Sequence, residues 1–363
     1  SLGDVSGCPG VLRGQRSRTL HPGVAALVIH QRVAGIASGR DALPLFLAPM
    51  LLVGVTSSVV ACGDGGPAEI EASDSDTVVV DGASLFWGAD PAAHVWADGK
   101  LWIYPTRDSH DWDSLTGWDA WSTEDLRTWI RHPGIFEAEQ CLWCTNNAWA
   151  PDAAYRNGQY YFYYYFRNDG GLPRGIGVAV SGNPEGPFEN VTIERPLVDG
   201  HDPAVLIDED GQAYLYTGHV IYFLNEDMTS LEMRGDGRPR DNIVEFRGHD
   251  PVGGWEGVWV FKREGRYYFT IADTDYRQLR YYMSDSPTGP FDYGGTLLHH
   301  VDGLNIHPSI VQWNGRWILF FHLWAESARG QRRVSAEFIT FRPDGSIEPV
   351  SVTEHGISGR APV

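Results

Sequence analysis

The sequence predicts an all-β fold, a five-bladed β-propeller, from three observations. After about residue 85, long helical periodicity is absent, while short aromatic and β-branched runs are repeatedly interrupted by Asp-Gly, Asn-Gly or Glu-Gly. The pattern of strand, tight turn and strand occurs five times. The turn glycines follow one another at intervals of 50 to 59 residues: Gly99, Gly158, Gly211, Gly265 and Gly315. A repeat of this length, with room for about four strands, is typical of a propeller blade.

The five copies support this prediction in order along the chain. They read "DPAAHVWADGKLWIY" from Asp90, "WAPDAAYRNGQYYFYYY" from Trp149, "DPAVLIDEDGQAYLY" from Asp202, "EGVWVFKREGRYYF" from Glu256 and "HPSIVQWNGRWILFF" from His307. Glycine suits each turn because hairpin turns need positive φ. A β-sandwich would show less regular spacing, and a parallel β-helix would repeat on a much shorter period. We therefore expect one propeller over residues 82–352, followed by a tail, 353–363.

The first part of the chain has the character of an export signal. Several arginines precede an apolar run from Leu43 to Cys62, and its ending "VVAC" resembles a bacterial lipobox. We expect residues 1–61 to form an export signal region, with translation starting downstream of residue 1, and Cys62 to be lipidated. A retained transmembrane anchor is less favoured because Pro44 and Pro49 interrupt the run. Residues 62–81 are small and acidic, which predicts a flexible linker on a protein anchored at the bacterial cell envelope.

Charge and cysteine content narrow the classes of partner. The 363 residues carry a formal net charge of -19, which disfavours binding to nucleic acid or anionic lipid and leaves neutral glycans open. Contact with a membrane is then expected only through the lipid anchor. Cys141 and Cys144 in "CLWC" lack the second pair that a zinc site needs, so we expect a structural disulfide.

Three carboxylates occupy the same place in three of the five repeats. Asp90, Asp202 and Glu256 each stand nine residues before the turn glycine of their repeat. Because the first strand of each blade lines the axis of a propeller, these side chains should converge on one cavity. Acidic groups that share a cavity repel one another unless they do chemistry or hold a cation. Asp152 is six residues before Gly158 and off this register, so we interpret it as structural.

Other residues are candidates for contacts with a ligand. His307, eight residues before Gly315, is a hydrogen-bond partner for substrate, a metal ligand at the centre, or a buried histidine bonded to backbone. Trp149 occupies the axial position in the second repeat and is a candidate platform for stacking a sugar. Arg332 and Arg333 are adjacent; either one of them reaches the cavity or both lie at a solvated strand end.

These motifs together resemble glycoside hydrolase family 43, the five-bladed inverting enzymes that act mainly on arabinose- and xylose-containing plant polysaccharides. The similarity covers about residues 82–352 and rests on "ADP" at 89–91, "WAPD" at 149–152, the four later repeats, and two "GPF" turns. Two motifs depart from the common pattern, with "EGVW" in place of "EGPW" and "HPS" in place of "HHS".

The resemblance implies a role for each candidate. Asp90 would be the general base that deprotonates water, Glu256 the general acid that protonates the glycosidic oxygen, and Asp202 the residue that tunes that acid. His307 would match a family histidine that binds a central Ca²⁺ or positions substrate, and Arg333 an arginine that contacts sugar. The chemistry itself would need no cofactor.

The sequence therefore predicts an inverting glycosidase that releases α-L-arabinofuranose or β-D-xylose from arabinan- or xylan-type polysaccharides or oligosaccharides. Two alternatives stay open. An endo-arabinanase would act inside linear arabinan, and a non-catalytic surface lipoprotein would bind glycan without cleaving it. A propeller that serves as a protein-binding scaffold is less favoured, because aligned acids at the axis would serve no purpose there.

Overall fold

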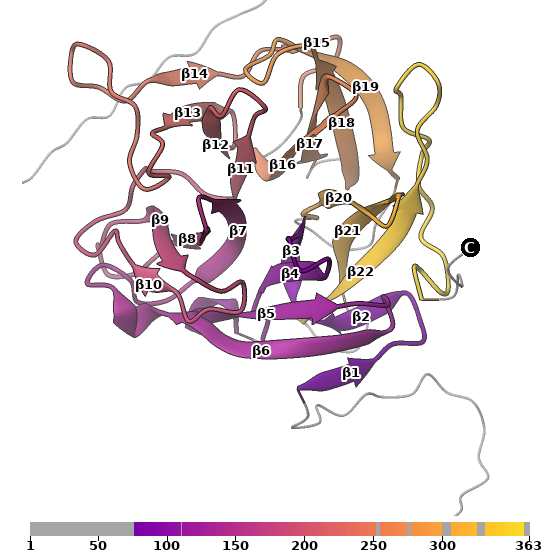
Figure 1. Ribbon diagram of the computed structural model, residues 1–363, viewed down its shortest axis with the longest axis horizontal. Helices are drawn as coiled ribbons and strands as arrows, with labels where there is room; N and C mark the ends of the chain where they lie inside the picture. Colours follow the sequence, from indigo (N-terminus) through magenta and orange to yellow (C-terminus); the bar gives the residue numbers. More distant parts are fainter. Residues whose placement is uncertain are drawn as a thin grey trace, which may run out of the picture. The chain divides into compact units, whose positions relative to one another are not determined.

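Five β-sheets surround one central axis in the computed structural model of the chain, which describes residues 76–109, 111–251, 255–273, 277–299, 306–324 and 331–358 (Figure 1). Within these ranges the only helical segments are two 3₁₀ turns, η1 (Trp112–Ser114) and η2 (Ala138–Gln140). The prediction of an all-β, five-bladed propeller is confirmed.

Each blade starts at the axis and continues outward, and four of its strands pair antiparallel with their neighbours. From the axis outward, the strands are, in blade 1, β3 (Ala89–Val95), β4 (Leu101–Thr106), β5 (Gly117–Thr123), β6 (Thr128–Glu137) and β1 (Thr77–Val79); in blade 2, β7 (Ala148–Arg156), β8 (Gln159–Phe166), β9 (Gly175–Ser181) and β10 (Glu189–Asn190); in blade 3, β11 (Pro203–Ile207), β12 (Ala213–Thr217), β13 (Val220–Leu224) and β14 (Asp241–Ile243); in blade 4, β16 (Glu256–Arg263), β17 (Arg266–Asp273), β18 (Gln278–Ser284), β19 (Phe291–Leu298) and β15 (Phe246–Arg247); and in blade 5, β20 (Ser309–Trp313), β21 (Arg316–Trp324), β22 (Arg332–Ile339) and β2 (Ser84–Trp87). The outermost strand of blade 4, β15, is parallel to β19.

The turns between the first two strands of the blades have the backbone that their sequences predict. In blade 2, Asn157 has φ 54° and Gly158 has φ 82°; in blade 4, Glu264 has φ 50° and Gly265 has φ 78°. Two successive residues with positive φ define the turn that best matches the twist of a tight hairpin. These turns set the register in which the innermost strand of each blade returns toward the axis.

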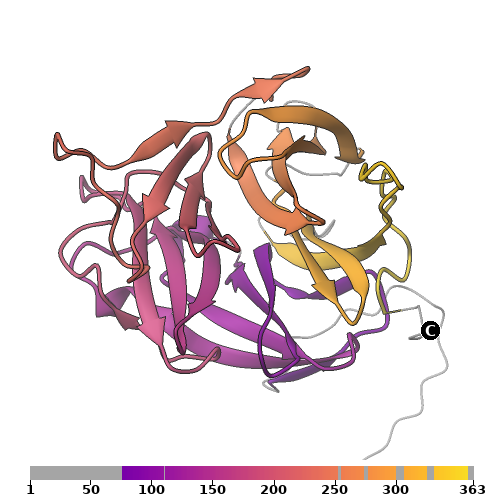
Figure 2. The ribbon, with the colours of Figure 1, turned by 45° about the horizontal axis from the view of Figure 1, so that its top comes forward.

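The innermost strands form a closed ring. Around the axis, β3 contacts β7, β7 contacts β11, β11 contacts β16, β16 contacts β20, and β20 contacts β3 (Figures 1 and 2). Because every blade begins with its innermost strand, the residues that open these strands gather at one end of the axis. The packing between blades is largely aromatic: the largest fully buried side chains include Trp118, Trp129, Tyr164 and Tyr281.

An N-terminal strand closes the ring by completing the last blade. Strand β2 pairs antiparallel with β22, with Phe86 opposite Val334 and Trp87 opposite Arg333. Phe86 is buried, and its ring stacks on Trp121 of blade 1 with centroids 4.2 Å apart. Blade 5 is therefore built from both ends of the propeller, and it is also packed against blade 1.

The ordered fold extends beyond the predicted boundaries at both ends. Thr77 in β1 pairs with Ile130 at the edge of β6, so the predicted linker is a strand in its last part and does not reach residue 81 as flexible chain. An unpaired sheet edge offers a row of free N–H and C=O groups, which β1 uses. Beyond residue 352, Ile357 is buried and the Ser358 hydroxyl donates to the Gly82 carbonyl at 3.0 Å, so the predicted tail packs on the propeller as far as Ser358.

Closure of the ring by β2 predicts a large effect of Phe86→Ala. Removing a buried aromatic ring leaves a cavity and should lower the free energy of unfolding by about 3 kcal/mol. Val79→Ala in β1 is the control, because Val79 is 69% exposed and its loss should cost at most about 0.5 kcal/mol. Denaturant titration of both variants measures the difference. Equal stabilities would show that β2 does not hold the ring closed.

Candidate active site

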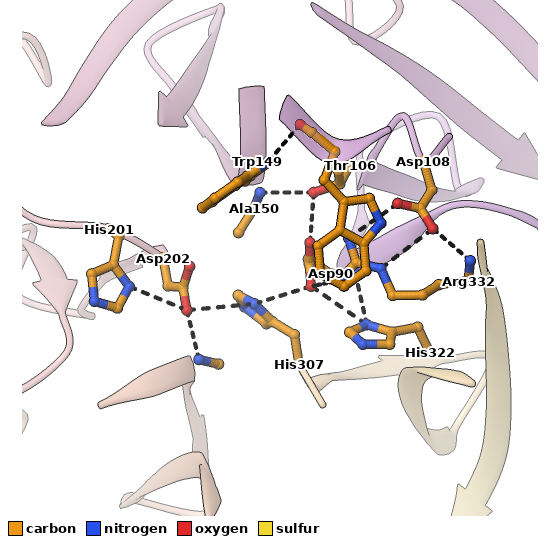
Figure 3. A network of polar contacts seen from close by, with 12 residues as sticks. Asp90, Thr106, Asp108, Trp149, Ala150, His201, Asp202, His307, His322 and Arg332 are labelled. Carbon is orange, nitrogen blue, oxygen red and sulfur yellow. Dashed lines mark hydrogen bonds and ion pairs between the residues drawn. The ribbon is translucent and has the colours of Figure 1, made fainter. Parts of the chain in front are cut away.

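A cavity of about 440 Å³ opens where the innermost strands begin. Its walls come from all five blades, and Asp90, Asp202 and Glu256 all line it. The structure therefore brings together the three carboxylates that the nine-residue spacing predicted. Trp149 and His307 also line the cavity. Figure 3 shows Asp90, Asp202 and His307 converging on its floor.

Two of the carboxylates stand on unusual backbone. Asp90 has φ 48° and Asp202 has φ 52°, and each is followed by proline. Positive φ in a residue other than glycine costs roughly 1–3 kcal/mol and is found at functional sites. Hydrogen bonds hold both positions: the Asp90 N–H donates to His322 Nδ1 at 3.0 Å, and the Asp202 side chain accepts from the Gly257 N–H at 2.8 Å.

Asp90 is a buried carboxylate surrounded by donors. The Thr106 hydroxyl donates to its Oδ2 at 2.7 Å, and Arg332 Nη1 donates to its Oδ1 at 3.2 Å. Burial alone would raise the pKa of Asp90, but the Arg332 charge, followed by His322, His307 and the Thr106 hydrogen bond, lowers it below the ordinary value of 3.8. Asp90 is therefore ionised at neutral pH and can accept a proton.

Asp202 is held ionised by the other side of the cavity. Its Oδ2 lies 3.5 Å from His201 Nδ1 and 3.9 Å from His307 Nδ1. Burial disfavours the charge, but His201, His307 and the Gly257 N–H together lower the pKa of Asp202 well below its usual range. The hydrogen bond to Asp202 in turn raises the pKa of His201 to about 9.

Glu256 has the opposite shift. It opens β16 and is partly buried in the cavity wall. Burial, and next the negative charge of Asp202, raise the pKa of Glu256 above its ordinary value of 4.5. One cavity thus contains a carboxylate that gives up its proton readily, Asp90, and a carboxyl group that keeps its proton more readily, Glu256.

His307 links the two aspartates. It is buried, and its Nδ1 lies 3.9 Å from both Asp90 Oδ1 and Asp202 Oδ2. Ca²⁺ takes about six to eight oxygen ligands, whereas His307 supplies a nitrogen. Throughout the described ranges, no group of three or more His, Cys, Asp or Glu side chains could hold a metal ion. The side chains here do not fit the predicted calcium site, and no step below uses one.

The structure corrects the arginine prediction. Successive side chains of a strand point to opposite faces, and in β22 Arg332 faces the cavity. Arg333 instead lies over the ring of Trp87 in β2, 4.1 Å from its centroid. The adjacent pair did contain an arginine of the cavity, but Arg333 is not that residue.

Tryptophans form one side of the cavity. Trp149, as predicted, lines it, and its Nε1 donates to the Trp112 carbonyl at 3.2 Å. The Trp112 ring also lines the cavity and lies 4.7 Å from the Arg332 guanidinium. Trp112 precedes blade strand β5 in η1, a segment that no repeat pattern marks.

Two predictions made beside the carboxylates agree with the structure. Asp152 is fully buried and accepts from His94 at 2.7 Å and from the Val205 N–H at 2.6 Å, so it joins blades rather than lining the cavity. Cys141 and Cys144 form a disulfide. Four residues around the carboxylates were not anticipated: Thr106, Asp108, His201 and His322. His201 alone had a local signal, since it directly precedes Asp202.

The predicted lipobox, including Cys62, lies outside the described residues. Among the residues that the structure does describe, no helix has the length and apolar content to span a membrane.

A closed propeller whose axial cavity holds a low-pKa aspartate and a raised-pKa glutamic acid has the parts of a glycoside hydrolase, in which one carboxylate activates water and a carboxylic acid protonates the leaving oxygen. Comparison with known proteins agrees with this class. The model for glycosyl hydrolases family 43 matches residues 86–347, and the chain belongs to this family. It is accordingly an enzyme that hydrolyses O-glycosyl bonds.

Curated relatives and solved structures are consistent with this assignment. The chain is 33% identical over 305 residues to "Beta-D-galactofuranosidase xynD" of Aspergillus niger, covering 76% of this chain and 85% of the relative. It is 32% identical over 316 residues to "Xylosidase/arabinosidase 43A" of Humicola insolens, covering 71% and 95%. A β-xylosidase/α-arabinofuranosidase from a compost metagenome, solved with xylotriose, has a TM-score of 0.67 at 27% identity and covers 76% of this chain and 99% of its own.

Proposed function

We propose that this protein is an inverting exo-glycosidase that removes terminal α-L-arabinofuranosyl or β-D-xylosyl groups from plant cell-wall polysaccharides or oligosaccharides. The observation that carries the proposal is the opposite pKa shift of Asp90 and Glu256 in one cavity. Relatives named xylosidase/arabinosidase and a family 43 enzyme solved with xylotriose support the choice of sugar.

The proposed reaction uses the two carboxyl groups in turn. Asp90 accepts a proton from a water molecule, which attacks the anomeric carbon. Glu256 gives its proton to the glycosidic oxygen as the bond to the leaving group breaks. Proton transfer at both ends of the reaction is thereby supplied by side chains, and the chemistry needs no cofactor.

Asp202 and its neighbours prepare the acid. The negative charge of Asp202 favours the protonated form of Glu256, and His201 and His307 keep Asp202 itself ionised. The Gly257 N–H, directly after Glu256, donates to Asp202 and fixes the start of β16 next to it.

A second sugar is favoured by one relative. The Aspergillus niger protein is named for activity on β-D-galactofuranose, a furanose like arabinofuranose. The endo-arabinanase alternative has weaker support, since the Bacillus subtilis protein of that name is 25% identical over 264 residues. Aryl glycosides of the three sugars, together with linear arabinan, separate these substrates.

Proposed export and lipid anchoring rest on the sequence from Leu43 to Cys62. Fatty-acid labelling tests them: wild type should incorporate the label and Cys62→Ala should not. Label in both proteins, or in neither, would contradict the anchor at this cysteine.

Substitutions of the two carboxyl groups should separate their roles. We expect Asp90→Asn and Glu256→Gln each to lower kcat on an aryl glycoside with a poor leaving group by about 10²- to 10⁴-fold. With a leaving group acidic enough to depart unprotonated, Glu256→Gln should recover much of its rate and Asp90→Asn should not. Glu264→Gln is the control, because Glu264 lies in the β16–β17 turn at the far end of the blade. Wild-type rates in either cavity variant would refute the roles.

The pKa shifts predict a bell-shaped dependence of kcat/KM on pH. Asp90 must be ionised, so the rate falls as pH drops through its pKa, below the ordinary 3.8. Glu256 must be protonated, so the rate falls as pH rises through its pKa, above the ordinary 4.5. In Asp202→Asn the charge that helps to raise the Glu256 pKa is gone, and the alkaline limb should move to lower pH. An alkaline limb that stays in place would rule out this role for Asp202.

A further inference from the structure

A buried carboxylate, Asp108, lies behind the cavity wall and contacts the site only through an arginine. It follows β4, and its side chain is fully buried. Its Oδ1 accepts from Arg332 Nη2 at 3.2 Å, and its Oδ2 accepts from Arg332 Nε at 3.3 Å and from the Arg332 backbone N–H (Figure 3). Asp108 thus binds both the main chain and one edge of the guanidinium of Arg332.

The same guanidinium reaches Asp90 by its other end. Arg332 Nη1 donates to Asp90 Oδ1 at 3.2 Å, and the ring of Trp112 covers its face at 4.7 Å. The Arg332 side chain is only 6% exposed. One cation is therefore fixed between two carboxylates and an aromatic ring, and three of its five N–H groups are used by Asp90 and Asp108.

This sharing matters for the charge that Asp90 keeps. Burial would lower the pKa of Arg332, but Asp90 and Asp108 together raise it, so the trio of one cation and two anions stays charged and has a net negative charge. An arginine with a single carboxylate partner commonly turns its fork to bind both oxygens. Asp108 occupies the edge of the guanidinium that such a turn would present to Asp90.

We propose that Asp108 is a positioning residue for the hydrolysis: it holds Arg332 so that this arginine makes one hydrogen bond to Asp90 instead of a two-oxygen ion pair, and Asp90 stays available to water. The inference rests on the proposed function. Without Asp108, Arg332 turns toward Asp90, both oxygens of the base are engaged, and the attack of water slows while the sugar still enters the cavity.

A double-mutant cycle tests this inference with Asp108→Asn, Arg332→Lys and both together. Asn keeps one acceptor but turns an NH₂ group toward the donors of Arg332. We expect Asp108→Asn to lower kcat on an aryl glycoside by about 10- to 100-fold, with a much smaller change in KM. Because Asp108 acts through Arg332, the double variant should be no slower than Arg332→Lys alone. Effects that multiply in the double variant would overturn the proposal.

Asp119→Asn is the matched control for loss of a buried ion pair. Asp119 is buried in β5 of the same blade and binds Arg107 at 2.9 Å and Arg131 at 2.7 Å, away from the cavity. Both aspartate variants should lower Tm, and only Asp108→Asn should lower kcat. Equal kcat losses in the two would show that Asp108 is merely structural.

Two further readouts keep the outcomes distinct. If Asp108→Asn does not fold, Asp108→Glu, which keeps the charge but moves the carboxylate, takes its place with the same expectations. Wild-type turnover of the aryl glycoside tests the proposed function separately: turnover without coupling between Asp108 and Arg332 overturns this inference alone, whereas absence of turnover overturns the proposed function and this inference with it.

Discussion

The repulsion among three carboxylates in one cavity is the constraint on which the rest of the site depends. Asp90, Asp202 and Glu256 line the same space, and three negative charges there would oppose folding. The protein resolves this by treating them differently. Arg332 and the surrounding donors stabilise the charge on Asp90, His201 and His307 stabilise the charge on Asp202, and Glu256 is left as the group that holds a proton most readily. The solution to the repulsion is also the division of labour that hydrolysis needs.

The fold supplies the geometry that makes this constraint unavoidable. In a closed ring every innermost strand begins at the same end of the axis, so residues that open those strands meet regardless of their distance in sequence. The spacing of nine residues from carboxylate to turn glycine could be read without coordinates because each hairpin fixes the register of its own strand. Asp152 shows the same logic in reverse: it is off register, and the structure places it in contact with His94 and Val205 instead of the cavity.

What could not be read from the sequence depends on contacts between blades. A one-residue shift in register exchanges the two faces of a strand, and nothing in the sequence fixes the register of β22 against β21 and β2. Arg332 and Arg333 were therefore indistinguishable until the pairing was known. Thr106, Asp108 and His322 come from the second strand of one blade, the loop after it, and the second strand of another, and no repeat aligns them. The ends of the propeller were also misjudged, because β1 and the segment to Ser358 are held by the outer faces of blades already formed.

The stereochemistry of the first product tests the central claim most directly, since a base that activates water and a separate acid give inversion, whereas a carboxylate that attacks the sugar gives retention. Proton NMR of an aryl glycoside during its hydrolysis, recorded before the free sugar mutarotates, identifies the anomer that forms first. The account predicts the anomer opposite to that of the substrate. First appearance of the same anomer would mean that Asp90 or another carboxylate forms a bond to the sugar, and the assignment of Asp90 as the base for water would be wrong.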